Sequence, residues 1–189
     1  MADRPPRTAG RHAAPRAAGR KRPALLPRLG AGLLVCLVLS VLGLFPVQLV
    51  RVSSGSMAPA IDAGDLALVL RWPVSVERWD VVVADPEQPG AAPLVKRVVA
   101  FGGESVAVED GVLVVDGAAV CEPWSDPARL DGVWFGPVRV PEGAVFLLGD
   151  EREGSIDSRV FGPVDESRLR GVVLATAWPS PGGVPGTPC

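Results

Sequence analysis

Three places in the chain carry residues that together could form a serine-based catalytic site. The first is the segment 54–59, which reads Ser-Gly-Ser-Met-Ala-Pro and places two hydroxyls around a glycine. Glycine accepts strained backbone angles and proline fixes the following turn, so this segment predicts a small loop that presents Ser56. Taken alone, Ser-Gly-Ser is also typical of an ordinary turn or linker. A serine nucleophile further needs a base that removes its proton.

Few groups in this chain could be that base. The only histidine is His12, near the N-terminus, so a serine–histidine triad or a histidine-ligated zinc site further along is excluded. Apart from Lys21, the only lysine is Lys96, and every other cation after residue 28 is arginine. Lysine can lose its proton when burial disfavours the charged form, which arginine does not do. The remaining candidates are therefore Lys96 and the carboxylates.

Lys96 lies in an apolar segment, residues 93–99, that reads Pro-Leu-Val-Lys-Arg-Val-Val. Side chains alternate between the two faces of a strand, so Lys96 and Arg97 are expected on opposite faces. Either one of them points inward or the strand lies at an edge. The structural alternative is a lysine whose charged end extends to solvent.

The third place is the segment 149–159, Gly-Asp-Glu-Arg-Glu-Gly-Ser-Ile-Asp-Ser-Arg. Alternating acids and arginines are most often a solvated turn. The functional interpretation is a loop that an Asp157–Arg159 ion pair holds in place, so that Ser155 faces the lysine. Composition does not decide between the two.

The N-terminal part of the chain predicts a membrane anchor. Residues 1–28 hold eight basic groups against one acid, and residues 29–50 hold no charge. A helix of that length covers a hydrocarbon core of about 30 Å. We therefore expect a protein that crosses the cell membrane once. The positive-inside rule places the tail 1–28 in the cytoplasm and the residues after the span outside. A cleaved signal peptide is the weaker alternative, because the apolar run is long and no Ala-x-Ala site follows.

The tail and the body differ in charge and order. The tail is rich in arginine, alanine, proline and glycine without periodicity, which predicts disorder. An arm that binds nucleic acid or acidic lipid is the less favoured alternative. The rest holds 11 basic groups against 20 acids, so an acidic body argues against a nucleic-acid partner. Three cysteines without paired spacing exclude a thiolate metal site, and we expect no cofactor. Free thiols at Cys121 and Cys189 are favoured over their pairing.

After residue 59 the pattern predicts a mainly β domain over residues 51–179, followed by a flexible tail at 180–189. Asp110-Gly111 and Asp116-Gly117 are turn signals, and residues 166–170 suggest one short helical turn. Residues 86–93 and 124–136 read as loops. The expected strands are short β-branched runs at 66–70, 81–83, 94–99, 106–108, 112–115, 144–148 and 171–175.

In this order and spacing, the three places resemble the bacterial type I signal peptidases, the membrane-anchored serine–lysine proteases of peptidase family S26. Residues 64–69 (Gly-Asp-Leu-Ala-Leu-Val) and 79–83 (Trp-Asp-Val-Val-Val), together with Gly162, extend the likeness. It implies a signal-peptidase-like β domain that cleaves signal peptides from secretory preproteins with small residues at the first and third positions before the cut. A monomer is expected.

The resemblance also implies a role for single residues. Ser56 corresponds to the nucleophile and Lys96 to the general base, while Ser54 and the Ser56 N–H correspond to the oxyanion hole. Ser155 matches the hydroxyl that orients the lysine, and Asp157 with Arg159 matches a structural pair. Pocket positions for the small side chains fall near Val52, Ala67, Val83 and Val95. Glu151 stands where asparagine is usual, and it could raise the pKa of Lys96 if it points inward.

Two other classes of protein share some of these features. Self-cleaving serine–lysine peptidases of the repressor type have the same dyad on a related β fold, but the apolar span and the lack of a DNA-binding domain disfavour them. A membrane-tethered β module without activity is the non-enzymatic alternative. Retention of all four polar groups, Ser54, Ser56, Lys96 and Ser155, argues against it.

Overall fold

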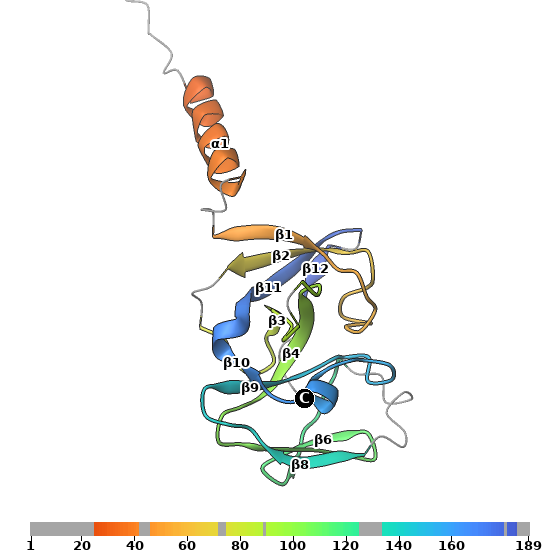
Figure 1. Cartoon of the computed structure of the whole chain (residues 1–189). Helices are drawn as coiled ribbons and strands as arrows, with labels where there is room; N and C mark the ends of the chain where they lie inside the picture. Colours follow the sequence, from red (N-terminus) through yellow and green to blue (C-terminus); the bar gives the residue numbers. More distant parts are fainter. Residues whose placement is uncertain are drawn as a thin grey trace, which may run out of the picture. The chain divides into compact units, whose positions relative to one another are not determined.

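The computed structural model describes residues 25–41, 46–71, 75–88, 90–124, 134–179 and 181–184. It divides into an N-terminal unit, Met1–Leu37, and a second unit, Val38–Cys189. Figure 1 shows the helix α1, most of which belongs to the first unit, and the strands of the second. The predicted tail 1–28 lies outside the described residues except for its last four positions, which belong to α1.

Helix α1 runs from Leu25 to Val41 and carries exposed aliphatic side chains such as Leu33 and Leu37. Of the helices in the described ranges, none combines the length and apolar character that crossing a bilayer requires. The prediction of one helix through residue 50 is wrong, because Val47–Arg51 is the strand β1. β1 pairs with the next strand over its full length, and these interstrand bonds replace the helical ones.

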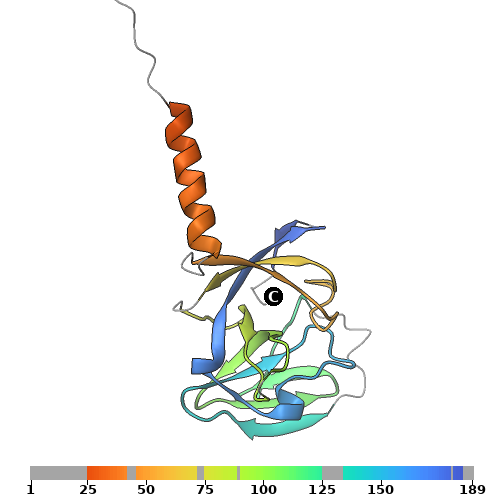
Figure 2. The ribbon, with the colours of Figure 1, turned by 45° about the horizontal axis from the view of Figure 1, so that its top comes forward.

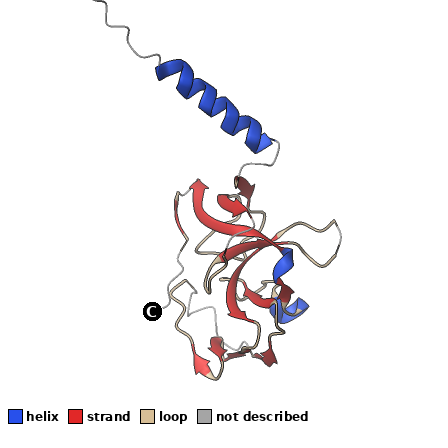
Figure 3. Ribbon diagram, turned by 90° about the vertical axis from the view of Figure 1, so that its left-hand side faces the viewer, coloured by secondary structure: helices blue, strands red, loops and turns tan. Residues whose placement is uncertain are grey.

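The larger sheet has eight antiparallel strands and forms most of the body. Along its main path the order is β1-β2-β11-β3-β4-β9-β10, and β12 pairs with β11. Figure 3 shows that strands dominate the body. The strands are β1, β2 (Leu66–Arg71), β3 (Val81–Ala84), β4 (Leu94–Phe101), β9 (Ala144–Leu148), β10 (Val164–Asp165), β11 (Leu169–Trp178) and β12 (Gly182–Gly183).

The smaller sheet has the order β7-β6-β5-β8 and is visible below the larger one in Figure 2. Its central hairpin turns at Asp110-Gly111, where both residues have positive φ, as a tight two-residue turn requires. Asp116-Gly117 makes the same kind of turn into the following strand. The strands are β5 (Ser105–Glu109), β6 (Val112–Val115), β7 (Ala118–Ala119) and β8 (Phe135–Arg139).

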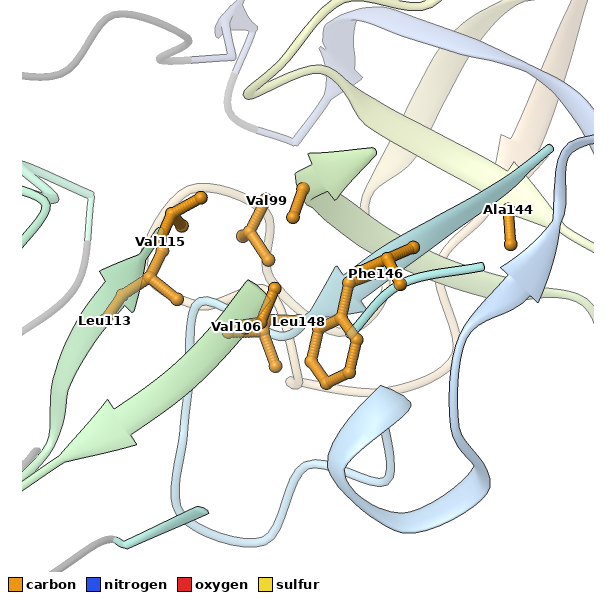
Figure 4. Close-up of a cluster of buried hydrophobic side chains, with 9 residues drawn as sticks. Val99, Val106, Leu113, Val115, Ala144, Phe146 and Leu148 are labelled. Carbon is orange, nitrogen blue, oxygen red and sulfur yellow. The ribbon is translucent and has the colours of Figure 1, made fainter. Parts of the chain in front are cut away.

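Aliphatic side chains fill both faces of the larger sheet. One cluster packs β4 and β9 against the smaller sheet around Phe146 and Leu113, as Figure 4 shows. A second lies around Met57, Val69 and Val83, and a third around Val82 and Leu147 on the opposite side of β3 and β4. The split follows from strand alternation, since Val82 and Val83 point to opposite faces.

All seven strands expected from β-branched runs are present, and the mainly β class is confirmed. The expected turn at 166–170 is the 3-10 helix η2, Glu166–Arg168, and the structure adds a four-residue helix α2, Ser158–Phe161. Part of the tail predicted to be flexible is ordered as β12, which pairs with β11. The strands that the sequence missed are short or, like β1, lie next to the long apolar run. The domain boundaries at 51 and 179 stay predictions.

Gly171 offers a test of how closely the strands approach one another. A Cβ atom at this position would lie 2.1 Å from the Leu70 carbonyl oxygen, a backbone atom in the paired strand β2. We expect Gly171→Ala to lower the free energy of unfolding by about 2 kcal/mol or more, because the sheet must shift to relieve the overlap. Urea unfolding of both proteins measures the difference.

Gly183→Ala is the matched control, since no atom lies within 4 Å of its built Cβ and its φ is not positive. Equal midpoints for Gly171→Ala and wild type would contradict the close packing of β11 on β2.

Candidate active site

The loop that carries Ser56 is closed at its base by backbone hydrogen bonds. The Val52 N–H donates to the Asp65 carbonyl at 2.9 Å, and the Gly64 N–H donates to the Val52 carbonyl at 2.8 Å. Met57 and Ile61 are fully buried in the cluster beneath the loop. Burial of these two apolar side chains leaves the serines on the outer side, with Ser54 exposed and Ser56 half-buried. Sequence alone predicted such a presentation of Ser56.

Lys96 reaches this loop from the strand β4. Its Nζ lies 2.6 Å from Ser56 Oγ and 3.2 Å from the Val95 carbonyl oxygen. Ser54 Oγ lies 3.3 Å from Ser56 Oγ, so the three polar groups form one chain of contacts. Lys96 is only 3% exposed, which rules out the alternative of a lysine that extends to solvent.

Burial lowers the pKa of the Lys96 ammonium from its ordinary value of 10.5, because the charged form loses its hydration. The negative charges of Asp157 and Asp150 act in the opposite direction and Arg159 adds to the lowering, but desolvation is the largest effect. The two carboxylates that raise the pKa are therefore Asp157 and Asp150, whereas Glu151 contributes its backbone: its N–H donates to the Ser56 carbonyl at 3.1 Å.

The segment 149–159 is a loop held by buried hydrogen bonds and an ion pair, and not a solvated turn. Arg159 Nε and Nη2 donate to the two Asp157 carboxylate oxygens at 2.8 and 2.9 Å, and the Gly149 N–H donates to Asp157 at 3.1 Å. Burial alone would raise the pKa of Asp157, but the hydrogen bonds and charge of Arg159 outweigh it and hold this pKa below its ordinary value. The predicted ion pair is present, and Asp157 also caps helix α2.

Ser155 is buried in the same loop and close to the serine loop. A Cβ atom added to Gly149 would lie 2.3 Å from Ser155 Oγ and 2.6 Å from the Ser56 carbonyl oxygen, so only glycine fits between them. Ser155 Oγ makes no hydrogen bond of ordinary geometry to the described residues, although it lies near enough to Asp157 to help lower its pKa. The orientation of Lys96 by Ser155 stays a prediction.

Arg97, the strand neighbour of Lys96, is buried on the other face of β4. Its Nε and Nη2 donate to the Asp150 carboxylate at 2.8 and 2.6 Å, and its Nη1 donates to the Trp79 carbonyl at 2.7 Å. The guanidinium also lies 4.2 Å from the ring centre of Trp124. Burial raises the pKa of Asp150, while the hydrogen bonds and charge of Arg97 oppose the rise. Both alternating side chains thus point inward, which sequence reasoning left open.

A second arginine of the loop is held by a residue that sequence reasoning missed. Arg152 forms a buried ion pair with Glu122, and its Nε donates to the Gly149 carbonyl at 2.9 Å. Burial raises the pKa of Glu122, and the charge and hydrogen bond of Arg152 oppose this. Glu122 lies 30 residues away in the chain. A glutamate between a cysteine and a proline in a loop carries no sequence signal for this role.

The four residues expected near the substrate pockets gather in one place. Val52, Ala67 and Val83 are buried and Val95 is half-buried, and all four belong to the apolar cluster beneath the serine loop. They therefore lie in the cluster beneath the loop that carries Ser56. Their role as pocket residues stays a prediction.

No group of histidine, cysteine or acidic side chains among the described residues is arranged to hold a metal ion. The expectation of free thiols at Cys121 and Cys189 is wrong for Cys121, which is disulfide-bonded, whereas Cys36 is free. Cys189 lies outside the described residues. Spacing along the chain could not reveal the bond, because disulfide formation depends on how far apart the thiols lie in the fold.

Comparison with known proteins identifies the family of this chain. The family model for signal peptidases of peptidase family S26 matches residues 27–178. The chain belongs to this family. It is 34% identical to signal peptidase I of Bacillus caldolyticus over 160 residues, which covers 77% of this chain and 86% of that protein.

Another relative within this family is signal peptidase I of Bacillus licheniformis, which is 34% identical over 132 residues. The match covers 64% of this chain and 70% of that protein. The chain was also compared with a crystal structure of a signal peptidase I from Enterococcus faecalis. The two sequences are 27% identical and the TM-score is 0.46, and the match covers 53% of this chain and 97% of the chain in the crystal structure. Family membership confirms that the chain is a peptidase of the signal peptidase type.

The Glu122–Arg152 pair gives a test of how the loop is held. Both side chains are almost fully buried, so Glu122→Ala leaves an uncompensated guanidinium behind. We expect a loss of about 3–5 kcal/mol in the free energy of unfolding. Asp85→Ala removes the partner of Arg170 from an exposed ion pair, in which the Arg170 side chain is 52% exposed and the Asp85 side chain 41%. It should change the free energy of unfolding by about 1 kcal/mol at most. Denaturant titration of the two variants compares them, and equal losses would contradict the buried role of Glu122.

Proposed function

We propose that this chain is a membrane-anchored serine endopeptidase that removes signal peptides from secretory preproteins, with Ser56 as the nucleophile and Lys96 as the general base. The observation that carries the proposal is the 2.6 Å contact between Lys96 Nζ and Ser56 Oγ at a buried lysine. A nucleophile and a base at hydrogen-bond distance are the geometric requirement for covalent catalysis.

The reaction follows from the protonation state of Lys96. A neutral amine accepts the Ser56 hydroxyl proton while Oγ attacks the carbonyl carbon of the scissile bond. The negative charge that develops on the carbonyl oxygen is stabilised by the Ser54 hydroxyl and the Ser56 N–H. The lysine then returns the proton to the leaving amine as the C–N bond breaks, which leaves an ester at Ser56. A water molecule, deprotonated by the same amine, hydrolyses that ester and restores the serine.

Surrounding residues take the supporting roles. Ser155 would accept or donate a hydrogen bond that orients the lysine, and the Asp157–Arg159 pair would keep the loop in place behind it. The apolar side chains of Val52, Ala67, Val83 and Val95 would line shallow pockets for small residues at the first and third positions before the cut. No cofactor is needed for this chemistry.

The membrane anchor in this proposal is the uncharged stretch from residue 29 to the start of β1, with the basic tail in the cytoplasm and the β domain outside the cell membrane. Its support is the sequence: eight cations precede the stretch and an acidic body follows it. The partners would be preproteins and lipid, without nucleic acid, and the enzyme would act as a monomer.

The cleavage test uses the full chain in detergent and a preprotein with an Ala-x-Ala site. We expect Ser56→Ala and Lys96→Arg to lose about 10³-fold or more in turnover, because the nucleophile is absent in one and arginine stays protonated in the other. Ser54→Ala should lower turnover about 10²–10³-fold, because the developing oxyanion loses one of its two hydrogen-bond donors. Quantified product on gels gives the rates.

Ser53→Ala is the matched control, since Ser53 is an exposed serine one position before Ser54. Thermal unfolding of each variant verifies that it is folded. Full activity of Lys96→Arg would place the base elsewhere, and an inert wild type would favour the tethered module without activity.

The pH profile provides a separate test. Only neutral Lys96 can accept the proton, so turnover should rise with pH as the amine deprotonates, and burial should bring the midpoint of this rise below the ordinary lysine pKa of 10.5. Initial rates across a pH series measure the midpoint of the rise. A rate that keeps increasing only above pH 10.5 would contradict the role of the buried amine.

A further inference from the structure

Two tryptophan rings pack together beside Arg97, the strand neighbour of Lys96. The ring centres of Trp79 and Trp124 lie 5.4 Å apart, and the ring planes are tilted by 42°. Aromatic pairs in proteins favour offset or tilted arrangements at separations of roughly 4.5–7 Å. Trp124 is 2% exposed, and Arg97 lies over its ring. One face of the buried guanidinium is therefore covered by an indole that a second indole supports.

Trp79 has a backbone conformation that a bulky residue seldom adopts. Its φ is +80°, in a region where side chains other than glycine meet a steric penalty. Its N–H donates to the Val98 carbonyl at 2.8 Å, and its carbonyl accepts a hydrogen bond from Arg97 Nη1 at 2.7 Å. Such conformations persist where the surrounding structure fixes them, and they cluster at functional sites. These contacts fix Trp79 against β4, close to the strand position of Lys96.

The Arg97–Asp150 ion pair joins the strand that carries Lys96 to the backbone of Ser56. Arg97 directly follows Lys96 in β4, and both side chains of the pair are 1% exposed. Asp150 precedes Glu151, whose N–H donates to the Ser56 carbonyl at 3.1 Å. One end of the pair is thus one residue from the base, and the other end is one residue from a hydrogen bond to the backbone of the nucleophile.

A buried ion pair keeps a single geometry only while water is kept away from it. Water that reached this pair would compete for its two hydrogen bonds, at 2.8 and 2.6 Å, and Asp150 could then shift. Trp124 blocks access on the side where its ring covers the guanidinium of Arg97. Misplacing a reacting group by about 1 Å can cost about 10²-fold in rate, so a smaller shift is sufficient to lower turnover.

We propose that Trp124, supported by Trp79, is a positioning residue for the cleavage reaction. Its ring holds the Arg97–Asp150 pair in place, and the pair in turn fixes the base relative to the nucleophile. The inference rests on the proposed function. The two tryptophans take no part in proton transfer, so their effect lies in the rate of the chemical step and not in the binding of the preprotein.

The experiment measures kcat and KM for cleavage of one preprotein by the full chain in detergent. We expect Trp124→Leu to lower kcat about tenfold and to leave KM within about twofold of the wild-type value, because the reacting groups are displaced while the binding surface is not. Trp124→Phe keeps an aromatic face over Arg97 and should retain at least about half of the wild-type kcat. Thermal unfolding of each variant verifies that it is folded.

Trp79→Gly separates positioning from stability by a second route. It removes the ring that supports Trp124, but glycine accepts the positive φ without a steric penalty, so the relief of strain offsets part of the lost packing. We expect kcat to fall about threefold to tenfold, again with KM nearly unchanged, in a protein that remains folded. This variant tests the assignment even if Trp124→Leu does not fold.

Phe135→Leu is the matched control. The Phe135–Phe146 pair has nearly the same geometry as the tryptophan pair, with ring centres 5.6 Å apart and a tilt of 43°. Phe135 and Trp79 also pack against the same cluster of buried aliphatic side chains. Phe135→Leu should lower the unfolding temperature and leave kcat unchanged.

Three results would overturn the assignment. If the variants of Trp124 and Trp79 keep kcat and only unfold more easily, as Phe135→Leu does, the rings act as core packing and the proposed function still stands. If Trp124→Phe loses as much kcat as Trp124→Leu, the aromatic face over Arg97 is not the group that acts. If wild type cleaves no preprotein, the proposed function fails and the positioning role fails with it.

Discussion

The buried contact between the Lys96 amine and the Ser56 hydroxyl sets the requirements for the rest of the domain. An amine acts as a base only when it is neutral, and water must be removed from around it before the neutral form is favoured near physiological pH. The sheet meets this requirement by placing Lys96 in a strand with neighbours on both faces. The loop 52–65 places Ser56 within hydrogen-bond distance of Lys96, with Met57 and Ile61 packed beneath the loop.

The division of labour between lysine and arginine follows from the same requirement. Arg97, Arg152 and Arg159 each pair with a carboxylate, and they hold Asp150, Glu122 and Asp157 in fixed positions. Such pairs also bring negative charge near the lysine, which opposes its deprotonation. The positive charge of Arg159 acts against these two carboxylates, and desolvation stays the largest effect on the pKa of Lys96. A lysine at any of the three arginine positions would be a weaker structural partner.

The smaller sheet contributes to the site through the segment that follows it. Glu122 pairs with Arg152, and Trp124 lies over Arg97, so one short stretch after β7 contacts two of the three arginines. The disulfide at Cys121 constrains the chain next to Glu122. The arginines of the loop 149–159 and of β4 therefore contact residues that lie far from them in the sequence.

The sequence by itself determined the local features of this protein. Seven strands follow from β-branched runs and two turns from Asp-Gly pairs, because these patterns act through neighbours in the chain. The proposed roles of Lys96 and Ser56 also come from the sequence, since residue type alone limits which group can act as a base. Tertiary structure decided the rest: the end of α1 before β1, the burial of both Lys96 and Arg97, the Glu122–Arg152 pair and the disulfide at Cys121. Each of these depends on which distant segments lie side by side, and the free energy of burying a charge or pairing a strand is set only when they meet.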